Sequence, residues 1–236
     1  MFVSGIAAEK SVPVVLVCGL SISSSYMIPA ALELALDSDV YCPDLPGFGK
    51  SSKPDHVLNV SELSNALFDF LQKSGIERAV IVAHSFGCQI AAEFALQYPE
   101  KLERLVLAAP SGDPSVNSIF RYLGNLALDA LREPLSLTPL AVRDYLMAGL
   151  LRGFRTFRFA MRDRVEEKLP RISAPTLVIH CSRDPIVSAQ WAEQVALLLP
   201  NAGLVTIEAA HAVNYNSPQE FARIIREFVE QNNSLK

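Results

Sequence analysis

One stretch decides the fold of this 236-residue chain: Arg78-Ala79-Val80-Ile81-Val82-Ala83-His84-Ser85-Phe86-Gly87-Cys88-Gln89-Ile90-Ala91-Ala92-Glu93-Phe94-Ala95. It begins with a short apolar, β-branched run, turns sharply at residues 83–87, and continues with apolar residues at helical spacing. This order predicts a strand, an abrupt turn and a helix, with Ser85 at the apex. A hydroxyl there would lie in front of a helix N-terminus, where free backbone N–H groups and the helix dipole stabilise negative charge.

Ser85 has two interpretations at this point. The pentapeptide follows the pattern small-x-Ser-x-Gly, which matches the G-x-S-x-G turn that exposes a catalytic serine, with Ala83 replacing the first glycine. The same residues also suit an ordinary strand-to-helix turn in which Ser85 is only the N-cap. The pentapeptide does not separate a nucleophile from a cap, so the rest of the chain must decide.

Composition and charge exclude several classes of protein. Half of the residues are hydrophobic and 19% are charged, which suits one sizeable domain with a large core. The net charge of −4 argues against a general nucleic-acid binder, and no apolar run is long enough to cross a bilayer. The first residues lack the basic start and apolar segment of a signal peptide, so we expect a cytoplasmic protein.

The four cysteines each lie in or beside an apolar, strand-like run. This placement favours buried free thiols in a reducing compartment, and no cysteine–histidine pair has the spacing of zinc ligands, so we expect no structural metal. The cysteines are Cys18, Cys42, Cys88 and Cys181.

Apolar, β-branched runs alternate with helix-like segments along most of the chain. Strands are predicted at 13–18, 39–43, 78–83, 105–109, 175–180 and 203–207. Helices are predicted near 27–36, 60–73, 87–98, 188–199 and 218–231. The alternation predicts a three-layer α/β fold with a mostly parallel sheet of about six strands, covered on both faces and joined by right-handed crossovers.

Residues 112–170 break this alternation because no strand signal interrupts them. Helices are predicted at 123–131, 140–150 and 154–168. We interpret the segment as a small helical lid inserted into a core that comprises residues 1–111 and 171–236. Such a lid would lie over the carboxyl ends of the strands, where ligands bind in parallel sheets.

Two sets of side chains in this segment have alternative interpretations. Four arginines would form either a clamp for an anionic substrate or, as we favour, the solvated face of an amphipathic helix. An apolar set would line an acyl pocket or pack inside the lid, and the sequence does not separate these. The arginines are Arg152, Arg155, Arg158 and Arg162, and the apolar residues are Phe120, Tyr122, Leu123, Met147 and Leu150.

Four landmarks occur in an order that carries a family resemblance. They are Asp44-Leu45-Pro46-Gly47-Phe48-Gly49-Lys50-Ser51, the turn at Ser85, the run Arg183-Asp184-Pro185-Ile186-Val187, and the run Ala209-Ala210-His211-Ala212-Val213-Asn214-Tyr215. The first is similar to a D-x-x-G-x-G-x-S loop, and Ser, Asp, His is the order that the fold uses. Over nearly its whole length the chain resembles the α/β-hydrolase superfamily, in particular its serine-esterase and meta-cleavage-product-hydrolase-like branch.

The sequence departs from the family's pattern in three places. Cys18 stands where the family commonly has the histidine of a His-Gly pair, and Ala83 replaces the first glycine of the serine turn. The usual first β-hairpin is expected to be mostly missing, because the first buried strand begins near Pro13.

The resemblance implies a catalytic triad of Ser85, Asp184 and His211. Ser85 would be the nucleophile, His211 the base that activates it and then the acid for the leaving group, and Asp184 the group that orients His211. Asp113 is the alternative acid, because some members of the fold place the acid just after the strand that follows the nucleophile helix.

Three other histidines compete less well with His211, which follows the last strand at the ligand-binding edge. His56 lies in a polar loop, His84 is expected to point away from the apex of the turn, and His180 is expected to pack at a strand end. The resemblance also implies an oxyanion hole formed by the backbone N–H groups of Phe86 and Leu20, with Ser21 as the alternative for the second.

The residues and the resemblance together predict a serine hydrolase that cleaves a small carboxylic ester, thioester or lactone. No cofactor is expected, the substrate would be a small molecule, and the protein would be a monomer or homodimer with no nucleic-acid or membrane partner. One alternative is carbon–carbon bond hydrolysis of a meta-cleavage product, although Cys88 replaces the second glycine typical of that branch. The other is a non-catalytic small-ligand-binding protein on the same fold.

Overall fold

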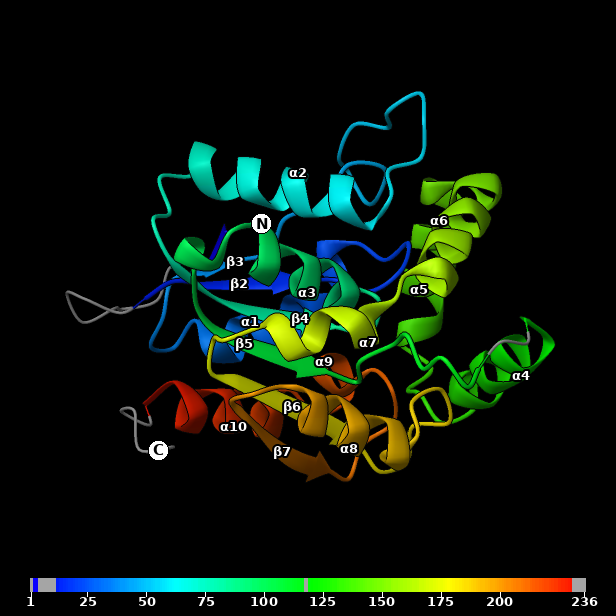
Figure 1. Cartoon of the computed structure of the whole chain (residues 1–236). Helices are drawn as coiled ribbons and strands as arrows, with labels where there is room; N and C mark the ends of the chain where they lie inside the picture. Colours follow the sequence, from blue (N-terminus) through cyan, green and yellow to red (C-terminus); the bar gives the residue numbers. More distant parts are fainter. Residues whose placement is uncertain (1, 4–11, 117–118, 231–236) are drawn as a thin grey trace.

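The computed structural model describes residues 2–3, 12–116 and 119–230 as one mixed sheet with helices on both faces (Figure 1). The strands are β1 (Phe2–Val3), β2 (Val14–Val17), β3 (Val40–Tyr41), β4 (Ala79–His84), β5 (Leu102–Ala108), β6 (Thr176–Cys181) and β7 (Ala202–Ile207). Their order across the sheet is β1-β3-β2-β4-β5-β6-β7, and every neighbouring pair is parallel except β1 with β3. The predicted six strands and three-layer architecture are confirmed.

The seventh strand, β1, is a short antiparallel addition at the sheet edge. Phe2 pairs with Tyr41 and Val3 pairs with Val40. Two residues carry no periodicity, so the apolar-run criterion did not identify them as a strand.

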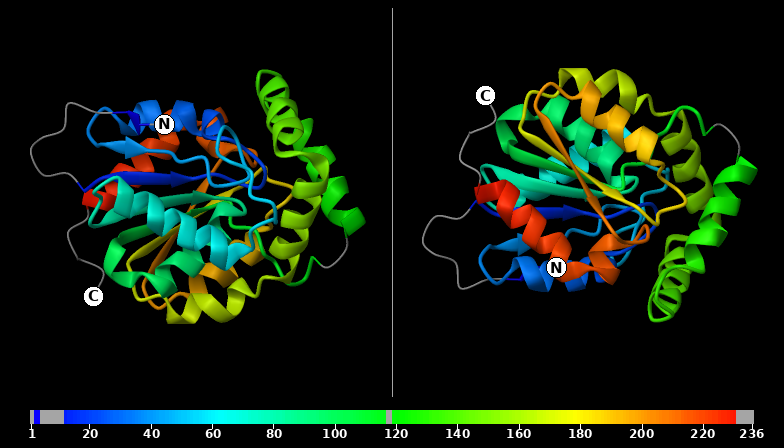
Figure 2. Two further views of the ribbon diagram at one scale, coloured as in Figure 1. Left: turned by 90° about the horizontal axis from the view of Figure 1, so that it is seen from above. Right: turned by 90° about the horizontal axis from the view of Figure 1, so that it is seen from below.

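Helices cover both faces of the sheet (Figures 1 and 2). On one face α1 (Ile28–Leu34) packs on α10 (Pro218–Glu230), beside the single-turn α9 (Val213–Asn216). On the other face lie α2 (Val60–Lys73), α3 (Gly87–Gln97) and α8 (Ala189–Leu198). Short 3-10 helices are η1 (Ser24–Met27), η2 (Pro99–Lys101) and η3 (Leu169–Arg171).

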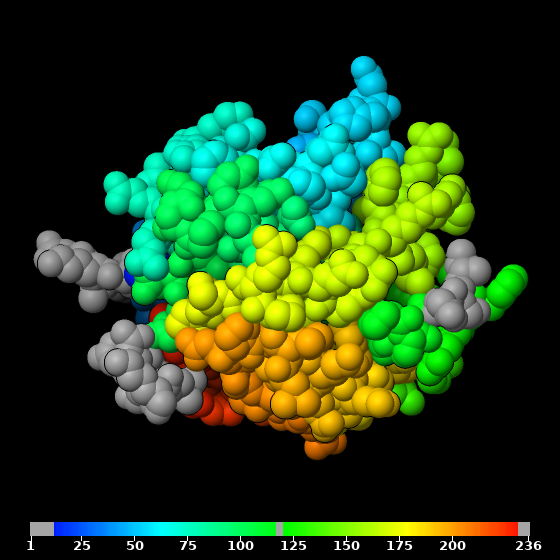
Figure 3. Space-filling model, in the orientation of Figure 1, coloured from blue at the N-terminus to red at the C-terminus, as the bar shows by residue number. Residues whose placement is uncertain are grey.

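Between β5 and β6 the described residues form helices and no strand, as predicted. These are α4 (Ile119–Ala130), α5 (Leu137–Ala148), α6 (Leu150–Arg162) and α7 (Val165–Lys168). Figures 1 and 2 show α4, α5 and α6 beyond the carboxyl ends of the strands, and Figure 3 shows α7 and the adjoining residues on the surface between α3 and α8. The division of the chain into a core and a lid at residues 112 and 170 remains a prediction.

The single helix predicted at 154–168 is wrong. The helix ends at Arg162, because Asp163 has an extended backbone and Arg164 is also outside the helical region. This break separates α6 from α7 and leaves Asp163 beside a cavity.

The central strand and the helix after the serine turn lie in close contact. All six residues of β4 are buried. A Cβ atom on Gly87 would lie 2.5 Å from the carbonyl oxygen of Val17 in β2, so only glycine lets α3 begin this close to the sheet. No helix formed by the described residues has the length and apolar character needed to cross a membrane.

Candidate active site

Ser85 lies directly after β4, at the sharp turn that the sequence predicted. Its φ is +55°, a left-handed conformation that a residue with a Cβ atom rarely adopts. The turn is held by the Ser85 N–H, which donates to the Ala108 carbonyl at 2.9 Å. The strained backbone presents the hydroxyl at the carboxyl edge of the sheet, in front of α3.

Two other polar side chains meet Ser85 at this edge, because the carboxyl ends of neighbouring parallel strands lie together. Asp184 follows β6 and His211 follows β7. The Ser85 hydroxyl lies 2.9 Å from His211 Nε2, and His211 Nδ1 lies 2.6 Å from Asp184 Oδ2. The structure therefore brings the three residues of the predicted triad into one hydrogen-bonded chain with the geometry of a nucleophile, a base and an orienting acid.

The second carboxylate oxygen of Asp184 is held by the backbone. Asp184 Oδ1 accepts hydrogen bonds from the N–H groups of Ile186 at 2.7 Å and Val187 at 3.2 Å, and its side chain is fully buried. Burial alone raises the pKa of this carboxyl, but the charge and hydrogen bond of His211 and the two N–H groups hold the pKa below its ordinary value. Asp184 is thus ionised and fixed in orientation.

The imidazole of His211 is strongly biased toward its cationic form. Burial alone lowers its pKa, but the charge and hydrogen bond of Asp184, with smaller contributions from Asp129 and Glu133, raise the pKa to about 9. In its neutral form, which predominates above this pKa, such an imidazole is a strong acceptor for the proton of a neighbouring hydroxyl.

The alternative acid does not reach His211 in the structure. Asp113 Oδ1 accepts a hydrogen bond from the Ser115 N–H at 2.8 Å, which closes a local turn. Because Asp184 occupies the position beside His211 Nδ1, the geometry favours Asp184 over Asp113 as the acid.

His84 differs from its expected orientation. Instead of pointing away from the site, its ring lies against that of His211, and Nε2 donates to the His211 carbonyl at 2.8 Å. Burial lowers the pKa of His84 to about 3, so the ring is a neutral donor that supports the His211 loop. His56 is exposed and bonds Glu62, and His180 is buried, as expected.

Two carboxylates near His211 were not identified as site residues from the sequence. Asp129, at the end of α4, lies 3.3 Å from the His211 N–H, and Glu133 accepts from the Ala212 N–H at 2.7 Å and from Asn216 at 2.9 Å. Asp129 is only 6% exposed, and burial raises its pKa to about 6. The spacing of four residues between Asp129 and Glu133 would place them on one face of a helix, but it does not indicate which loop that face contacts.

The loop after β2 lies close to Ser85. A Cβ atom on Gly19 would lie 3.3 Å from the Ser85 Cβ, and Ser21 has a φ of +59°. Among the turn and loop hydrogen bonds of the described residues, none is donated by the N–H of Leu20 or of Phe86. Both groups are therefore candidates to bind an oxyanion, and their role remains a prediction.

A cavity of about 630 Å³ opens in front of Ser85 and His211. Its wall is mainly aromatic and aliphatic, and it includes Tyr122 and Leu123 from the apolar set of the sequence analysis. The described residues contribute no lysine or arginine to this wall. Arg152 donates to the Pro54 and His56 carbonyls, and Arg155, Arg158 and Arg162 are exposed, which agrees with the favoured solvated face and not with an anion clamp.

The comparisons with known proteins agree with this architecture. The model of the alpha/beta hydrolase family matches residues 14–224. An uncharacterized protein of Mycobacterium tuberculosis is 34% identical, over 92% of this chain and 75% of that protein.

Two solved structures are similar in fold at low sequence identity. A hydrolase from Pseudomonas aeruginosa has a TM-score of 0.81 at 22% identity, with 98% of this chain and 93% of that chain covered. The enol-lactonase from Burkholderia xenovorans has a TM-score of 0.77 at 19% identity, with 98% and 95% covered. By the family match across most of its length, the chain belongs to the alpha/beta hydrolase family.

Proposed function

We propose that this protein is a serine hydrolase that cleaves a small carboxylic ester, thioester or lactone through an acyl-enzyme on Ser85. The observation that carries the proposal is the 2.9 Å contact between the Ser85 hydroxyl and His211 Nε2 at the wall of an apolar cavity. A nucleophile hydrogen-bonded to a base, with the base held by a buried acid, is the arrangement that acyl transfer needs.

In this mechanism His211 takes the hydroxyl proton as Ser85 attacks the carbonyl carbon. Asp184 stabilises the resulting imidazolium, which then protonates the leaving group. The backbone N–H groups of Phe86 and Leu20 bind the developing oxyanion, and one such donor is typically worth about 3 kcal/mol of the activation barrier. Water activated by His211 then releases the acyl group and restores the free Ser85.

The apolar cavity supports an uncharged acyl substrate. Its volume of about 630 Å³ is large enough for a drug-sized ligand, and most of the described residues that line it are aromatic or aliphatic. The fold likeness to an enol-lactonase makes lactones a useful part of a substrate panel.

The proposal is tested with a short-acyl p-nitrophenyl ester and a fluorophosphonate probe. The wild-type protein should turn over the ester and become labelled, and Ser85→Ala should lose both activities. Ser74→Ala, which changes an exposed serine at the end of α2, is the matched control and should retain both. Absence of turnover across an ester, thioester and lactone panel, together with absence of labelling, would refute the hydrolase and favour a non-catalytic ligand-binding protein.

A further inference from the structure

A second cavity, of about 380 Å³, adjoins the cavity that contains Ser85. The two share wall residues, and the second also contacts Phe86, directly after the nucleophile. The shared residues are Leu20, Tyr122, Phe157 and Ile186. The second cavity is therefore the neighbouring space into which a substrate bound at Ser85 would extend past these shared residues.

The second cavity contains polar atoms that lack partners. Within the described residues, Gln89 Oε1, Ser111 Oγ and Asp163 Oδ2 are buried and make no hydrogen bond. Gln89 is 1% exposed, and its Nε2 donates to the Ala160 carbonyl at 3.1 Å, which leaves the amide oxygen as the free acceptor. Buried polar atoms without partners are uncommon and destabilising in a native protein, so three at one cavity point to a ligand that satisfies them.

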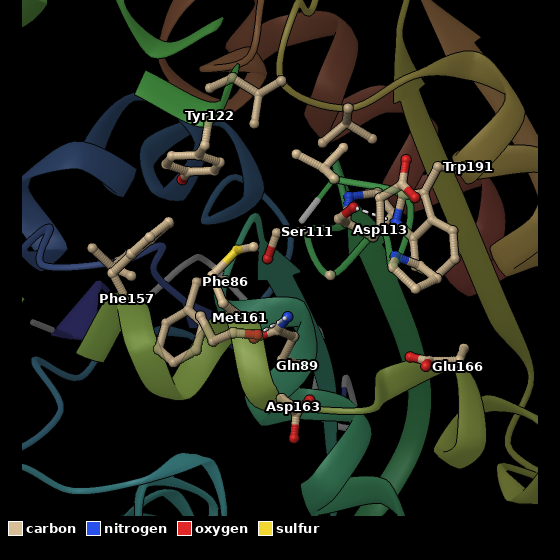
Figure 4. Close-up of a pocket in the computed structure, with 18 of the residues that line it drawn as sticks. Phe86, Gln89, Ser111, Asp113, Tyr122, Phe157, Met161, Asp163, Glu166 and Trp191 are labelled. Atoms are coloured by element: carbon tan, nitrogen blue, oxygen red, sulfur yellow. Dashed lines mark hydrogen bonds between the residues drawn. The ribbon is translucent and has the colours of Figure 1, made fainter. Parts of the chain in front are cut away.

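These atoms are arranged around one space. Gly112, directly after Ser111, lies against the Gln89 amide, because a Cβ atom on it would lie 2.6 Å from Gln89 Nε2. In the view of Figure 4, Ser111 and Gln89 appear between Phe157 on one side and Trp191 on the other. The backbones of both residues are bonded to the nucleophile turn, because the Ser111 N–H lies 3.4 Å from the Ser85 carbonyl and the Gln89 N–H donates to the Phe86 carbonyl at 3.0 Å. Their position relative to Ser85 is thus fixed by the backbone.

The charges around the second cavity disfavour an anionic ligand. Three carboxylates, Asp113, Asp163 and Glu166, line it. Arg164 is the single lysine or arginine that the described residues contribute to the lining, and it is already bonded to Glu166 at 2.6 Å. Asp163 Oδ1 is bonded by Lys168, and burial raises the pKa of this carboxyl.

We propose that this cavity is a specificity subsite that binds a neutral, hydrogen-bond-donating end of the substrate, a primary carboxamide, through Gln89 Oε1 and Ser111 Oγ. The inference rests on the proposed ester hydrolysis at Ser85. A carboxamide fits because its single nitrogen offers two N–H donors to two neighbouring acceptors without adding charge. A carboxylate offers no donor and meets the three surrounding carboxylates.

The test uses two pairs of isosteric esters that differ only in the end group. The first pair, carbamoylmethyl butyrate and isobutyl butyrate, places the group on the alcohol half. The second pair, the monoamide methyl ester of adipic acid and its isopropyl-ended isostere, places it on the acyl half. The measured quantity is the ratio of kcat/KM for the carboxamide ester to that for its isostere, in each protein; intrinsic ester reactivity cancels when proteins are compared.

Gln89→Met keeps the length of the side chain and removes its acceptor. We expect this change to lower the ratio by about tenfold in the pair whose end group enters the subsite. Ser111→Ala should lower it in the same pair, and this variant also serves as the test if Gln89→Met does not fold. Gln97→Met is the matched control, because Gln97 lies on the same helix but bonds Ser61, Ser64 and Glu93, and its ratio should equal that of the wild-type protein.

The outcomes separate the inference from the proposed function. An unchanged ratio in both pairs for folded Gln89→Met and Ser111→Ala proteins that still hydrolyse the esters would overturn the subsite and leave the hydrolase intact. A wild-type protein that neither hydrolyses the esters nor reacts with a fluorophosphonate would refute the hydrolase, and the subsite would fall with it.

Discussion

Replacing Asp129 with asparagine should move the pH dependence of catalysis to lower pH. The change removes one negative charge and keeps an oxygen that can accept the His211 N–H, which now lies 3.3 Å from Asp129 Oδ1. His211 must be neutral to take the proton of Ser85, so kcat/KM should rise as the pH passes through the His211 pKa. The negative charge of Asp129 favours the imidazolium and raises that pKa, and its removal therefore lowers it.

The size of the shift follows from the charges involved. Two unit charges roughly 6 Å apart interact by about 3 kcal/mol at an effective dielectric constant near 20, which corresponds to about two pKa units. Relaxation and solvent access reduce this interaction energy. We therefore expect the rising part of the kcat/KM profile, which lies near pH 9 in the wild-type protein, to shift about one pH unit lower. Asp129 has a pKa of about 6, so it is fully ionised where this rise lies.

The assay is the pH profile of kcat/KM with an ester whose hydrolysis is followed by acid release. The groups that face His211 are Asp184, Asp129, Glu133 and His84. His84 has a pKa of about 3 and stays neutral throughout the range, so it does not contribute to the rise.

Asp113→Asn is the control for the charge change. Asp113 bonds Ser115 in its own turn, and its substitution should leave the rise in place. If the rising part of the kcat/KM profile in Asp129→Asn lies at the same pH as in the wild-type protein, or at higher pH, the assignment of that rise to His211 is contradicted.

Three further outcomes are expected. Asp184→Asn should lower kcat by about 10⁴-fold because it removes the charge that fixes His211, whereas Asp113→Asn should lower it by less than about tenfold. Equal losses would contradict Asp184 as the acid, and a larger loss in Asp113→Asn would reverse the assignment. Gly87→Ala places a Cβ atom 2.5 Å from the backbone of β2 and should destabilise the fold by about 2 kcal/mol, which lowers Tm by roughly 6 °C. Gly124→Ala is the control and should leave Tm unchanged, because no atom lies within 4 Å of the added Cβ. The pKa of Asp129 is raised in the folded protein to about 6, so its ionisation removes stability as the pH rises from about 4 through 6. Asp129→Asn should therefore raise Tm by about 5 °C at pH 8 and by little at pH 4. A Tm difference between variant and wild type that is the same at both pH values would contradict this.

The sequence by itself was sufficient for the order of the elements and for the three side chains at the sheet edge. Apolar runs and helical spacing are local properties, and they identified six strands of the sheet. The carboxyl ends of parallel strands share one edge, so residues placed just after β4, β6 and β7 meet even though Ser85 and His211 are 126 residues apart. Chain order and sheet geometry together were enough to predict that meeting.

Only the tertiary structure decided what surrounds those side chains. Asp129 contacts the His211 loop, and Gln89 faces a second cavity with an unpartnered oxygen, because α4 and α6 pack over the strand ends in one particular orientation. Helical spacing fixes which side chains share a face of a helix, but not which loop that face meets. That choice depends on packing between segments far apart in the sequence, and no pattern in either segment encodes it.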